Sequence, residues 1–407
     1  MSKTILYLSY DGMTDQLGQS QVLPYLCGLS KKGYVIHLVS CEKKERFEVH
    51  KNLIQNIVDE NNIMWYPINY HKSPPILSTL FDIRQLIKKA EELHAIYKFD
   101  VVHCRSYITS FAGQWMKKKY GTKFIFDMRG FYADERVDGN IWKQSNPIFK
   151  FVYNYFKNKE KQFLQQADQI VSLTHNAKKI IDEWKLNGNN SLPINVIPCC
   201  ADLSHFDYNN FTADFMDKKK QSMGYISDDK IMVYLGAIGT WYMLPQMLDC
   251  YKIFRKNNQK IKLLFITNEP GEIILKQVTQ KSIDINDVKI ISATRNEVPP
   301  LLSICQYSIF FITPTFSKQA SSPTKQGEIM GMGIPIICNS GVGDTDYIIE
   351  QTHSGVLVPQ FTDLEYQKAY ERIENTSFEK AKTRQGANQF YSLQKGVEAY
   401  ENIYKKL

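Results

Sequence analysis

Short apolar runs alternate with helix-length amphipathic segments along the front half of this chain, and that alternation restricts the fold more than any other feature. Each apolar run has the length of a buried strand. Strands that alternate with helices predict a parallel, doubly wound sheet with helices on both faces. The runs lie at residues 5–9, 35–40, 101–104, 123–126 and 170–173, and helical candidates lie at 20–32, 80–97 and 147–166.

The back half repeats this pattern. A chain of 407 residues exceeds what one hydrophobic core usually supports, so we expect two α/β domains. The predicted domains are 1–202 and 203–389, with a hinge at 196–202 and an amphipathic final helix at 390–407. Two such sheets imply a cleft between the domains, with ligands at the carboxyl ends of the strands. The second set of runs lies at 231–235, 261–267, 288–291, 307–312 and 334–338, with helices at 242–256 and 324–332.

Composition excludes several classes of protein. No apolar run approaches the roughly 18 residues that a membrane span needs, and the N-terminus lacks a signal-peptide layout. The eight cysteines are scattered without a CxxC pair, which predicts reduced thiols in a cytoplasmic protein.

The net charge of +8 gathers in lysine clusters at 117–119, 157–161 and 218–220. These are solvated surfaces or a basic face resting on anionic lipid at the inner face of the cell membrane. The aromatic and basic segment 149–157 is an alternative membrane contact, although we expect it to form a buried helix. No nucleic-acid motif accompanies the charge.

Residues 321–335 resemble a helix start that can hold an anion and a diol. Ser322 is expected to cap the helix, with Pro323 at its first position. Lys325 and Glu328 lie three apart on one face, so a cation for phosphates and a pair of acceptors for ribose hydroxyls stand together. An ordinary capped surface helix is the alternative.

In each half of the chain, one glycine-containing loop follows the first strand. Gly18, in loop 10–20, permits close approach of the backbone to a ligand. In loop 235–242, Gly236 and Gly239 resemble a phosphate-cradling turn that ends at a helix capped by Thr240. The first loop is equally well explained as a surface turn, and the second is not a GxGxxG dinucleotide fingerprint.

A third loop, 126–138, interleaves charged residues with aromatics, which indicates a substrate-facing loop. It carries Asp127, Arg129, Asp134 and Arg136, and the preceding strand ends at 101–107. We place His103 and Arg105 on that strand, beside the loop, and take them with Asp134 and Arg136 as substrate-binding candidates. A lone histidine is nevertheless more often a satisfied core residue than a catalyst.

Together these segments resemble a retaining glycosyltransferase of the GT-B fold, in the group 1 family (family 4). Residues 16–26 resemble the family's first loop, and 196–202 with Phe206 its hinge. Residues 328–335 read Glu-Ile-Met-Gly-Met-Gly-Ile-Pro and are similar to its most specific motif, Glu-Ala-Met-Ala-x-Gly-x-Pro. The last helix resembles the one that crosses back to the front domain.

The resemblance implies a role for each candidate residue. The front domain would bind the acceptor, and the back domain would bind the nucleotide sugar. The acceptor-binding set is His103, Arg105, Asp134 and Arg136. Glu328 would bind the ribose, and Lys325 with the Gly236–Thr240 loop would hold the diphosphate. The full donor-binding set is Gly18, Gly236, Gly239, Thr240, Ser321, Ser322, Thr324 and Glu328, and the catalytic set is Asp127, Arg129 and Lys325.

Three departures from the family pattern stand out. Ala320 occupies the position of a first motif glutamate, and Ser321, Ser322 or Thr324 is its candidate substitute. The back-half glycine loop carries no basic residue, which leaves more of the phosphate charge to Lys325. The histidine that many members place after the strand ending at Asp127 is also missing, so Asp127 or Arg129 is its candidate replacement.

The activity implied is transfer of a sugar from a UDP or GDP type donor to an acceptor hydroxyl, with retention and without a metal or other cofactor. Front-face attack, in which the departing phosphate takes the acceptor proton, needs no enzymic nucleophile. The expected setting is bacterial cell-surface polysaccharide or glycolipid synthesis, with a glycan or lipid-linked acceptor. A nucleotide-sugar epimerase of the same fold, a solute-binding protein and an inactive nucleotide-binding homologue remain alternatives.

Overall fold

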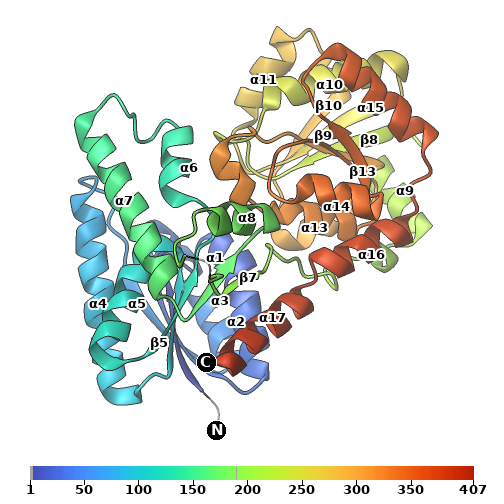
Figure 1. Ribbon diagram of the computed structural model, residues 1–407. Helices are drawn as coiled ribbons and strands as arrows, with labels where there is room; N and C mark the ends of the chain where they lie inside the picture. The colour runs from blue at the N-terminus through green and yellow to red at the C-terminus, as the bar shows by residue number, and fades with distance from the viewer. Residues whose placement is uncertain (1–2, 189) are drawn as a thin grey trace. The chain divides into compact units, whose positions relative to one another are not determined.

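A computed structural model describes residues 3–188 and 190–407 of the chain. The chain divides into two compact units, Met1–Pro198 with Leu393–Leu407, and Cys199–Ser392. Each unit contains one parallel sheet with helices on both faces, which confirms the predicted class of two Rossmann-like α/β units (Figure 1). The sequence had placed the unit boundaries at residues 202 and 390.

Within the described residues, the sheet of the first unit has seven strands in the order β3-β2-β1-β4-β5-β6-β7. Strand β1 is central and buried, and its Ile5 is in register with Ile36 of β2 and with Val101 of β4. The chain thus extends the sheet from β1 first to one edge and then to the other, which creates a switch point between β1 and β4. The strands are β1 Thr4–Ser9, β2 Val35–Glu42, β3 Ile63–Asn69, β4 Val101–Arg105, β5 Lys123–Asp127, β6 Gln169–Ser172 and β7 Ile194–Val196.

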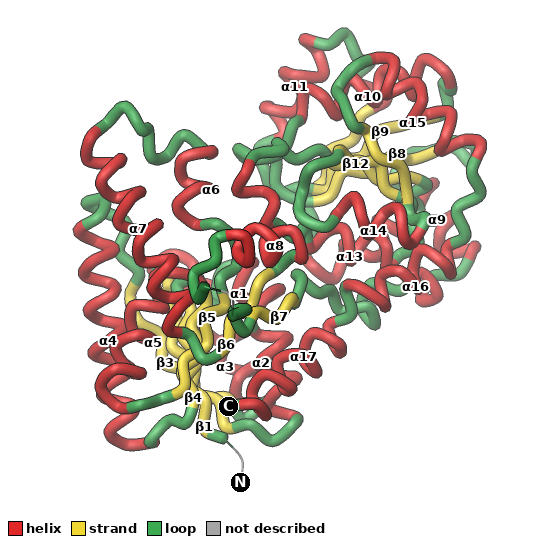
Figure 2. Tube along the Cα trace, viewed as in Figure 1, coloured by secondary structure: helices red, strands yellow, loops and turns green. Residues whose placement is uncertain are grey.

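The helices of this unit form a layer on each side of the sheet (Figure 2). Helices α4, α5 and α7 lie on one side, and α2, α3 and α17 lie on the other (Figure 1). The helices are α1 Gln16–Gln21, α2 Leu23–Lys31, α3 Lys44–Glu60, α4 Leu77–Tyr97, α5 Ser106–Tyr120, α6 Tyr132–Asp138, α7 Pro147–Gln166, α8 His175–Glu183 and α17 Leu393–Lys406.

The last helix, α17, belongs to the first unit although it follows the whole of the second in sequence. It packs against α2, where Gly28 leaves room for Val397. Its Tyr404 main-chain oxygen accepts a hydrogen bond from Lys3 Nζ at 2.6 Å. The predicted return of the C-terminal helix to the N-terminal domain is therefore confirmed.

The sheet of the second unit has six strands in its described residues, in the order β10-β9-β8-β11-β12-β13. The strands are β8 Lys230–Leu235, β9 Ile261–Ile266, β10 Val288–Ile291, β11 Tyr307–Phe310, β12 Ile336–Asn339 and β13 Gly355–Val358. The helices are α9 Ala213–Ser222, α10 Leu244–Asn257, α11 Gly271–Gln280, α12 Val298–Leu302, α13 Thr324–Gly331, α14 Thr345–Thr352, α15 Asp363–Asn375 and α16 Lys380–Phe390.

One predicted helix differs from the structure. Residues 20–32 were expected to form one helix, but the chain forms α1 and α2 with a break at Val22. Pro24 explains the break, because it has no N–H to continue the hydrogen bonds of α1 and suits the first turn of a new helix. Ser20 Oγ donates to Gln16 O within α1 instead of capping a helix.

No helix among residues 3–188 and 190–407 has the length and apolar character needed to cross a membrane. All eight cysteines fall in this described part of the chain, and all are free thiols.

The packing of α17 gives a first prediction. A Cβ on Gly28 would lie 2.5 Å from Val397 Cγ2. Because both helices are packed against the unit, we expect Gly28→Ala to lower the free energy of unfolding by about 1–3 kcal/mol. Urea denaturation monitored by circular dichroism measures this change.

A double-mutant cycle provides the control. Val397→Ala removes the methyl groups that the new Cβ meets, so adding it to Gly28→Ala should cost less than it does alone. Strictly additive losses would show that the two helices do not touch at this point.

Candidate functional site

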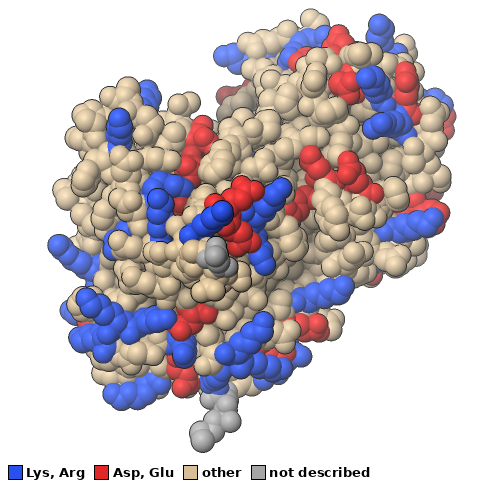
Figure 3. All heavy atoms as spheres, viewed as in Figure 1, with Lys and Arg blue, Asp and Glu red and all other residues tan. Residues whose placement is uncertain are grey.

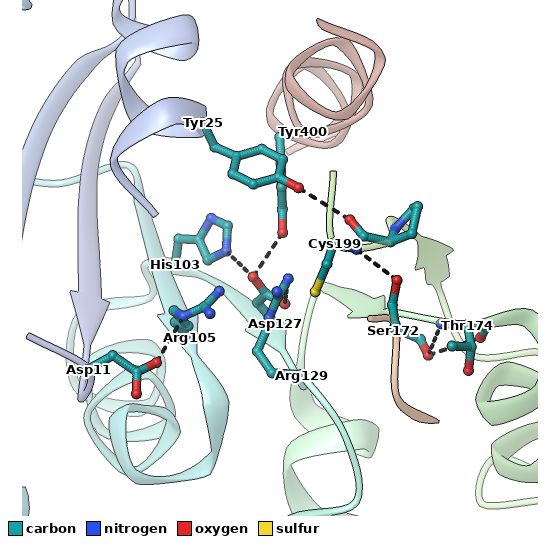
Figure 4. A network of polar contacts seen from close by, with 12 residues as sticks. Asp11, Tyr25, His103, Arg105, Asp127, Arg129, Ser172, Thr174, Cys199 and Tyr400 are labelled. Atoms are coloured by element: carbon teal, nitrogen blue, oxygen red, sulfur yellow. Dashed lines mark hydrogen bonds and ion pairs between the residues drawn. The ribbon is translucent and has the colours of Figure 1, made fainter. Parts of the chain in front are cut away.

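The carboxyl ends of β4 and β5 carry polar side chains around one buried carboxylate, that of Asp127 (Figure 4). The Tyr400 hydroxyl on α17 donates to Asp127 Oδ2 at 2.9 Å, and His103 Nε2 lies 3.5 Å from the same oxygen. His103 Nδ1 lies 2.8 Å from the Tyr404 hydroxyl, and Arg129 Nη1 lies 3.8 Å from Asp127 Oδ1. The carboxylate therefore joins two strands to the last helix.

The protonation states of this cluster follow from burial and charge. Burial opposes ionisation of Asp127, but Arg129 and His103 outweigh it and hold its pKa at about 2. Burial lowers the pKa of His103 although Asp127 opposes the shift. At neutral pH the pair is a carboxylate and a neutral imidazole. So weak a base as Asp127 accepts a proton poorly. These contacts favour a positioning role for Asp127, whose catalytic role stays a prediction.

Two arginines lie at the same edge of the sheet. Arg105, the last residue of β4, is buried, and its Nε donates to Asp11 Oδ2 at 3.1 Å (Figure 4). Arg129 follows β5 with a φ of 58°, a left-handed conformation that residues other than glycine rarely adopt. Such strained positions cluster at functional sites. The structure thus brings Arg105, Arg129, Asp127 and His103 together.

Glu42, the last residue of β2, holds the first glycine loop. Its carboxylate accepts hydrogen bonds from the backbone N–H groups of Met13 at 2.7 Å and Thr14 at 3.1 Å. Gly18 packs on the same loop, where a Cβ would lie 2.2 Å from Gly12 O. Backbone packing alone therefore requires glycine at position 18, and its donor-binding role stays a prediction.

Asp134 and Arg136, on α6, have different surroundings. Asp134 is buried, and its two oxygens accept hydrogen bonds from the Tyr153 hydroxyl at 2.9 Å and Lys157 Nζ at 2.8 Å, both on α7. Arg136 is partly exposed, with its guanidinium 4.8 Å from the centre of the Tyr132 ring. Asp134 therefore fixes α6 to α7, and Arg136 is the better placed of the two to meet a ligand.

Lys325 is the central cation of the second unit. It is buried on α13, with Nζ 3.8 Å from the centre of the Tyr242 ring and 3.3 Å from the Tyr234 hydroxyl. Burial lowers its pKa to about 7, although the nearby Glu328 opposes that shift. An ammonium group stripped of water and lacking an anionic hydrogen-bond partner here would gain strongly from a phosphate.

The glycine loop after β8 passes over this lysine. Gly236 has a φ of 109°, and a Cβ there would lie 3.1 Å from Lys325 Nζ. Gly239 and Thr240 are exposed. The prediction that Thr240 caps the following helix is wrong, because α10 begins only at Leu244. The loop and the lysine nevertheless meet, as expected for a phosphate site.

The start of α13 also differs by one residue from the prediction. Pro323, not Ser322, is the N-cap residue, and Thr324 is the first helical residue. Ser322 lies one position too early to cap, and its Oγ accepts a hydrogen bond from the backbone N–H of Cys199 at 3.1 Å. Ser321 precedes it in extended conformation. The helix end therefore lacks a side-chain cap.

Glu328 lies one turn further along α13, mostly buried, with Oε1 3.5 Å from Arg295 Nη1. Burial raises its pKa, while Arg295 and Lys325 oppose the shift. Ala320, at the position where a glutamate was expected from the resemblance, is fully packed. One carboxylate therefore serves this helix end.

Two aspartates follow β12: Asp344 is the N-cap residue of α14, and Asp346 lies in the first turn of that helix. Both oxygens of Asp346 lie 3.2 Å from the backbone nitrogen of Gly341, so this carboxylate holds the loop between β12 and α14. Among residues 3–188 and 190–407, no three histidine, cysteine, aspartate or glutamate side chains gather in a way that could hold a metal ion.

Two basic residues near the donor candidates were not found from the sequence. Lys318 Nζ lies 3.6 Å from the centre of the Trp241 ring, which brings a cation to the glycine loop that has none of its own. Arg295 reaches Glu328 from the short helix before α12. No local pattern marks either one, because each is brought there by the sheet order.

The glycine loop yields a prediction with a matched control. Gly236→Ala forces a left-handed φ on a residue with a Cβ and crowds Lys325, so we expect a loss of about 1–3 kcal/mol in unfolding free energy. Gly239→Ala meets no atom within 4 Å and should leave stability nearly unchanged. Equal stabilities of the two variants in urea denaturation would refute this account of the loop.

Lys325 yields a pH-dependent prediction. Its folded pKa of about 7 lies below its ordinary value of 10.5, so the unfolded state binds more protons between these values. Burial of the charge thus destabilises the fold fully below pH 7, and the cost disappears as pH rises toward 10.5. Lys325→Met should therefore raise stability by about 1–4 kcal/mol at pH 6 and by progressively less above pH 7.

Thermal and urea unfolding at pH 6, 8 and 9.5 would follow this difference. Lys276→Met, which changes an exposed lysine on α11, is the control and should show no such trend. A constant difference between Lys325→Met and the wild type at all three pH values would contradict the assignment.

Comparisons with known proteins concern the fold and the first unit. Residues 20–205 match the model of glycosyltransferase family 4. A search of curated proteins gave no match. A glycosyltransferase from Rickettsia africae superposes with a TM-score of 0.72 at 16% identity, covering 100% of this chain and 98% of that one.

Two further solved structures have the same fold. Sucrose-phosphate synthase from Thermosynechococcus elongatus gives a TM-score of 0.71 at 13% identity, over 99% of this chain and 98% of the other. HepE from Anabaena, solved in complex with UDP and glucose, gives 0.70 at 12% identity over 100% of both. The chain therefore has the GT-B fold of these glycosyltransferases, and its residues 20–205 are similar to glycosyltransferase family 4.

Proposed function

We propose that this protein transfers a sugar from a nucleotide-diphosphate sugar to an acceptor hydroxyl, with retention at the anomeric carbon and without a metal. The observation that carries the proposal is the buried Lys325 ammonium beneath the Gly236 loop, with Glu328 one turn along the same helix. A diphosphate and a ribose need such a pair of groups. HepE is solved with UDP and with UDP-glucose, which favours a UDP type donor.

The mechanism assigns each group a physical task. Negative charge develops on the departing diphosphate, and Lys325 with the backbone N–H groups at the start of α13 would stabilise it. The departing phosphate would take the proton of the acceptor hydroxyl. Gly239, Thr240, Ser321, Ser322 and Thr324 are the remaining donor candidates, and Arg105, Arg129 and Arg136 supply positive charge for the acceptor side.

Asp127 fits this mechanism as a positioning residue. Its carboxylate is committed to Tyr400, His103 and Arg129, and its low pKa leaves it a weak base. In a front-face reaction the enzyme needs no base of its own, so a buried carboxylate that aims Arg129 is sufficient. The buried Ala320 supplies no carboxylate for the acid/base pair that an epimerase of this fold would need.

Calorimetry with UDP, GDP and uridine tests the donor site. We expect one diphosphate to bind, and Lys325→Met to weaken it about 10- to 100-fold because a charge-assisted contact is lost. Glu328→Gln should weaken both the diphosphate and its nucleoside, whereas Lys325→Met should leave the nucleoside unaffected. Absence of binding by any nucleotide would overturn the transferase proposal, and NMR of the anomeric product decides retention.

The cellular role we propose is synthesis of a bacterial cell-surface polysaccharide or glycolipid, at the inner face of the cell membrane. Helix α7 supports membrane contact. This helix was expected to be buried, but only one of its two apolar stripes is buried. The second stripe is exposed and consists of Ile148, Phe151 and Tyr155, and the Phe151 side chain is 71% exposed. Exposed Lys143 and Lys150 flank it, as suits anionic lipid.

The lysine clusters named from the sequence are weaker candidates. Lys117 pairs with Asp168 at 2.7 Å, and Lys119 pairs with Glu91. Basic and acidic side chains interleave on the visible face (Figure 3). These clusters therefore fit a solvated surface better than a lipid-binding one.

Co-sedimentation with phosphatidylglycerol vesicles tests the α7 surface. Phe151→Glu should reduce the bound fraction about tenfold, because an apolar contact is replaced by a charge that the lipid repels. Val49→Glu, at a residue 72% exposed on α3, is the matched control. Equal binding by both variants would remove α7 from the membrane contact.

A further inference from the structure

A second polar cluster in the first unit lies outside the residues used above. It is centred on Asp82, a fully buried carboxylate on α4. Asp82 Oδ1 lies 2.6 Å from His71 Nδ1, and Oδ2 accepts hydrogen bonds from the backbone N–H of His71 at 3.1 Å and from the Tyr10 hydroxyl at 2.9 Å. Burial and Asp82 raise the pKa of Tyr10, so its hydroxyl stays a donor.

This arrangement fixes the orientation of the His71 ring. The carboxylate oxygen accepts the hydrogen bond, so Nδ1 is the donor to Asp82. The longer 3.4 Å approach of Gln85 Nε2 to the same nitrogen does not compete. In this tautomer Nε2 carries the lone pair of the ring. The described residues provide Nε2 with no hydrogen-bond partner, and the side chain is 37% exposed.

Aromatic rings lie around the His71–Asp82 pair. Phe81 packs edge-on against His71 with ring centres 4.9 Å apart and is itself 50% exposed, and Tyr70 contacts Tyr10 at 5.4 Å. A polar nitrogen beside an open aromatic face suits a saccharide, because sugar rings present hydroxyls at their edges and C–H groups on their faces.

The cluster lies at the carboxyl ends of the strands, the edge at which parallel α/β sheets bind ligands. Tyr10 directly precedes Asp11, the partner of Arg105, and His71 follows the carboxyl end of β3. Three strand spacings separate β3 from β4, which is about 14 Å. That distance exceeds the span of one sugar, so a group bound at His71 would be remote from an acceptor hydroxyl that reacts near Arg105.

We propose that His71, held by Asp82 and flanked by Phe81, is a subsite for a non-reacting sugar unit of an oligosaccharide acceptor. This inference rests on the proposed transferase function and extends it to the acceptor. His71 Nε2 accepts a hydrogen bond from a sugar hydroxyl, and Phe81 offers its face to the ring. His71 and Asp82 position the acceptor and take no part in the chemistry, so the subsite contributes affinity rather than rate.

NMR of full-length protein labelled with ¹⁵N-histidine tests the subsite directly. The probes are the disaccharides lactose, cellobiose, maltose and chitobiose, each titrated to its solubility limit. We expect the His71 Nε2 resonance to move with at least one probe. His94 lies on the same helix as Asp82 but twelve residues further along, about 18 Å away, so it should stay unchanged and serves as an internal control. If none of the four moves His71, the proposal is overturned.

Two variants separate orientation from folding. His71→Phe keeps a ring against Phe81 but lacks the nitrogen, and it should weaken the responding disaccharide about tenfold. Asp82→Asn should weaken it similarly through loss of ring orientation, with circular dichroism confirming the fold. UDP affinity measured on the same samples should not change. If the wild-type protein does not bind UDP, the donor proposal fails. The response of His71 to the disaccharides tests the subsite alone, so the two failures can be told apart.

Discussion

In the first unit, the arrangement of side chains at the carboxyl ends of β4 and β5 depends on the buried charge of Asp127. A carboxylate removed from water is stable only when several partners compensate it, and here the partners come from β4, the loop after β5 and α17. Each partner is thereby fixed in place. Burial of this one anion therefore holds an arginine, a histidine and a tyrosine in a fixed arrangement at one edge of the sheet.

The second unit instead buries a cation whose charge is only partly compensated. Lys325 is buried among tyrosine rings, and no carboxylate of the described residues is in hydrogen-bond contact with it. The free protein therefore carries an unfavourable charge or loses the proton. Cation–π contacts compensate only in part. An anion with the geometry of a phosphate would relieve this cost, which makes the helix start more selective for charge than an exposed lysine would be.

Periodicity in the sequence was sufficient for the layers and for most strands, because buried parallel strands are nearly uninterrupted apolar runs. It missed β3, which contains Pro67 and a half-exposed face, and β13, which is short. The Lys325–Glu328 pair was found because both lie on one helix. Lys318, Arg295 and the His71–Asp82 pair were not, since they meet their partners only through tertiary contacts.

The return of residues 393–407 to the first unit has a consequence for synthesis on the ribosome. Tyr400 and Tyr404, which complete the surroundings of Asp127 and His103, are translated after every residue of the second unit. Until α17 has been translated, Asp127 of the first unit therefore lacks the hydrogen bond from Tyr400, and the surface of α2 that α17 covers stays exposed. The second unit can close its sheet meanwhile, so the later-made unit is able to mature before the earlier one.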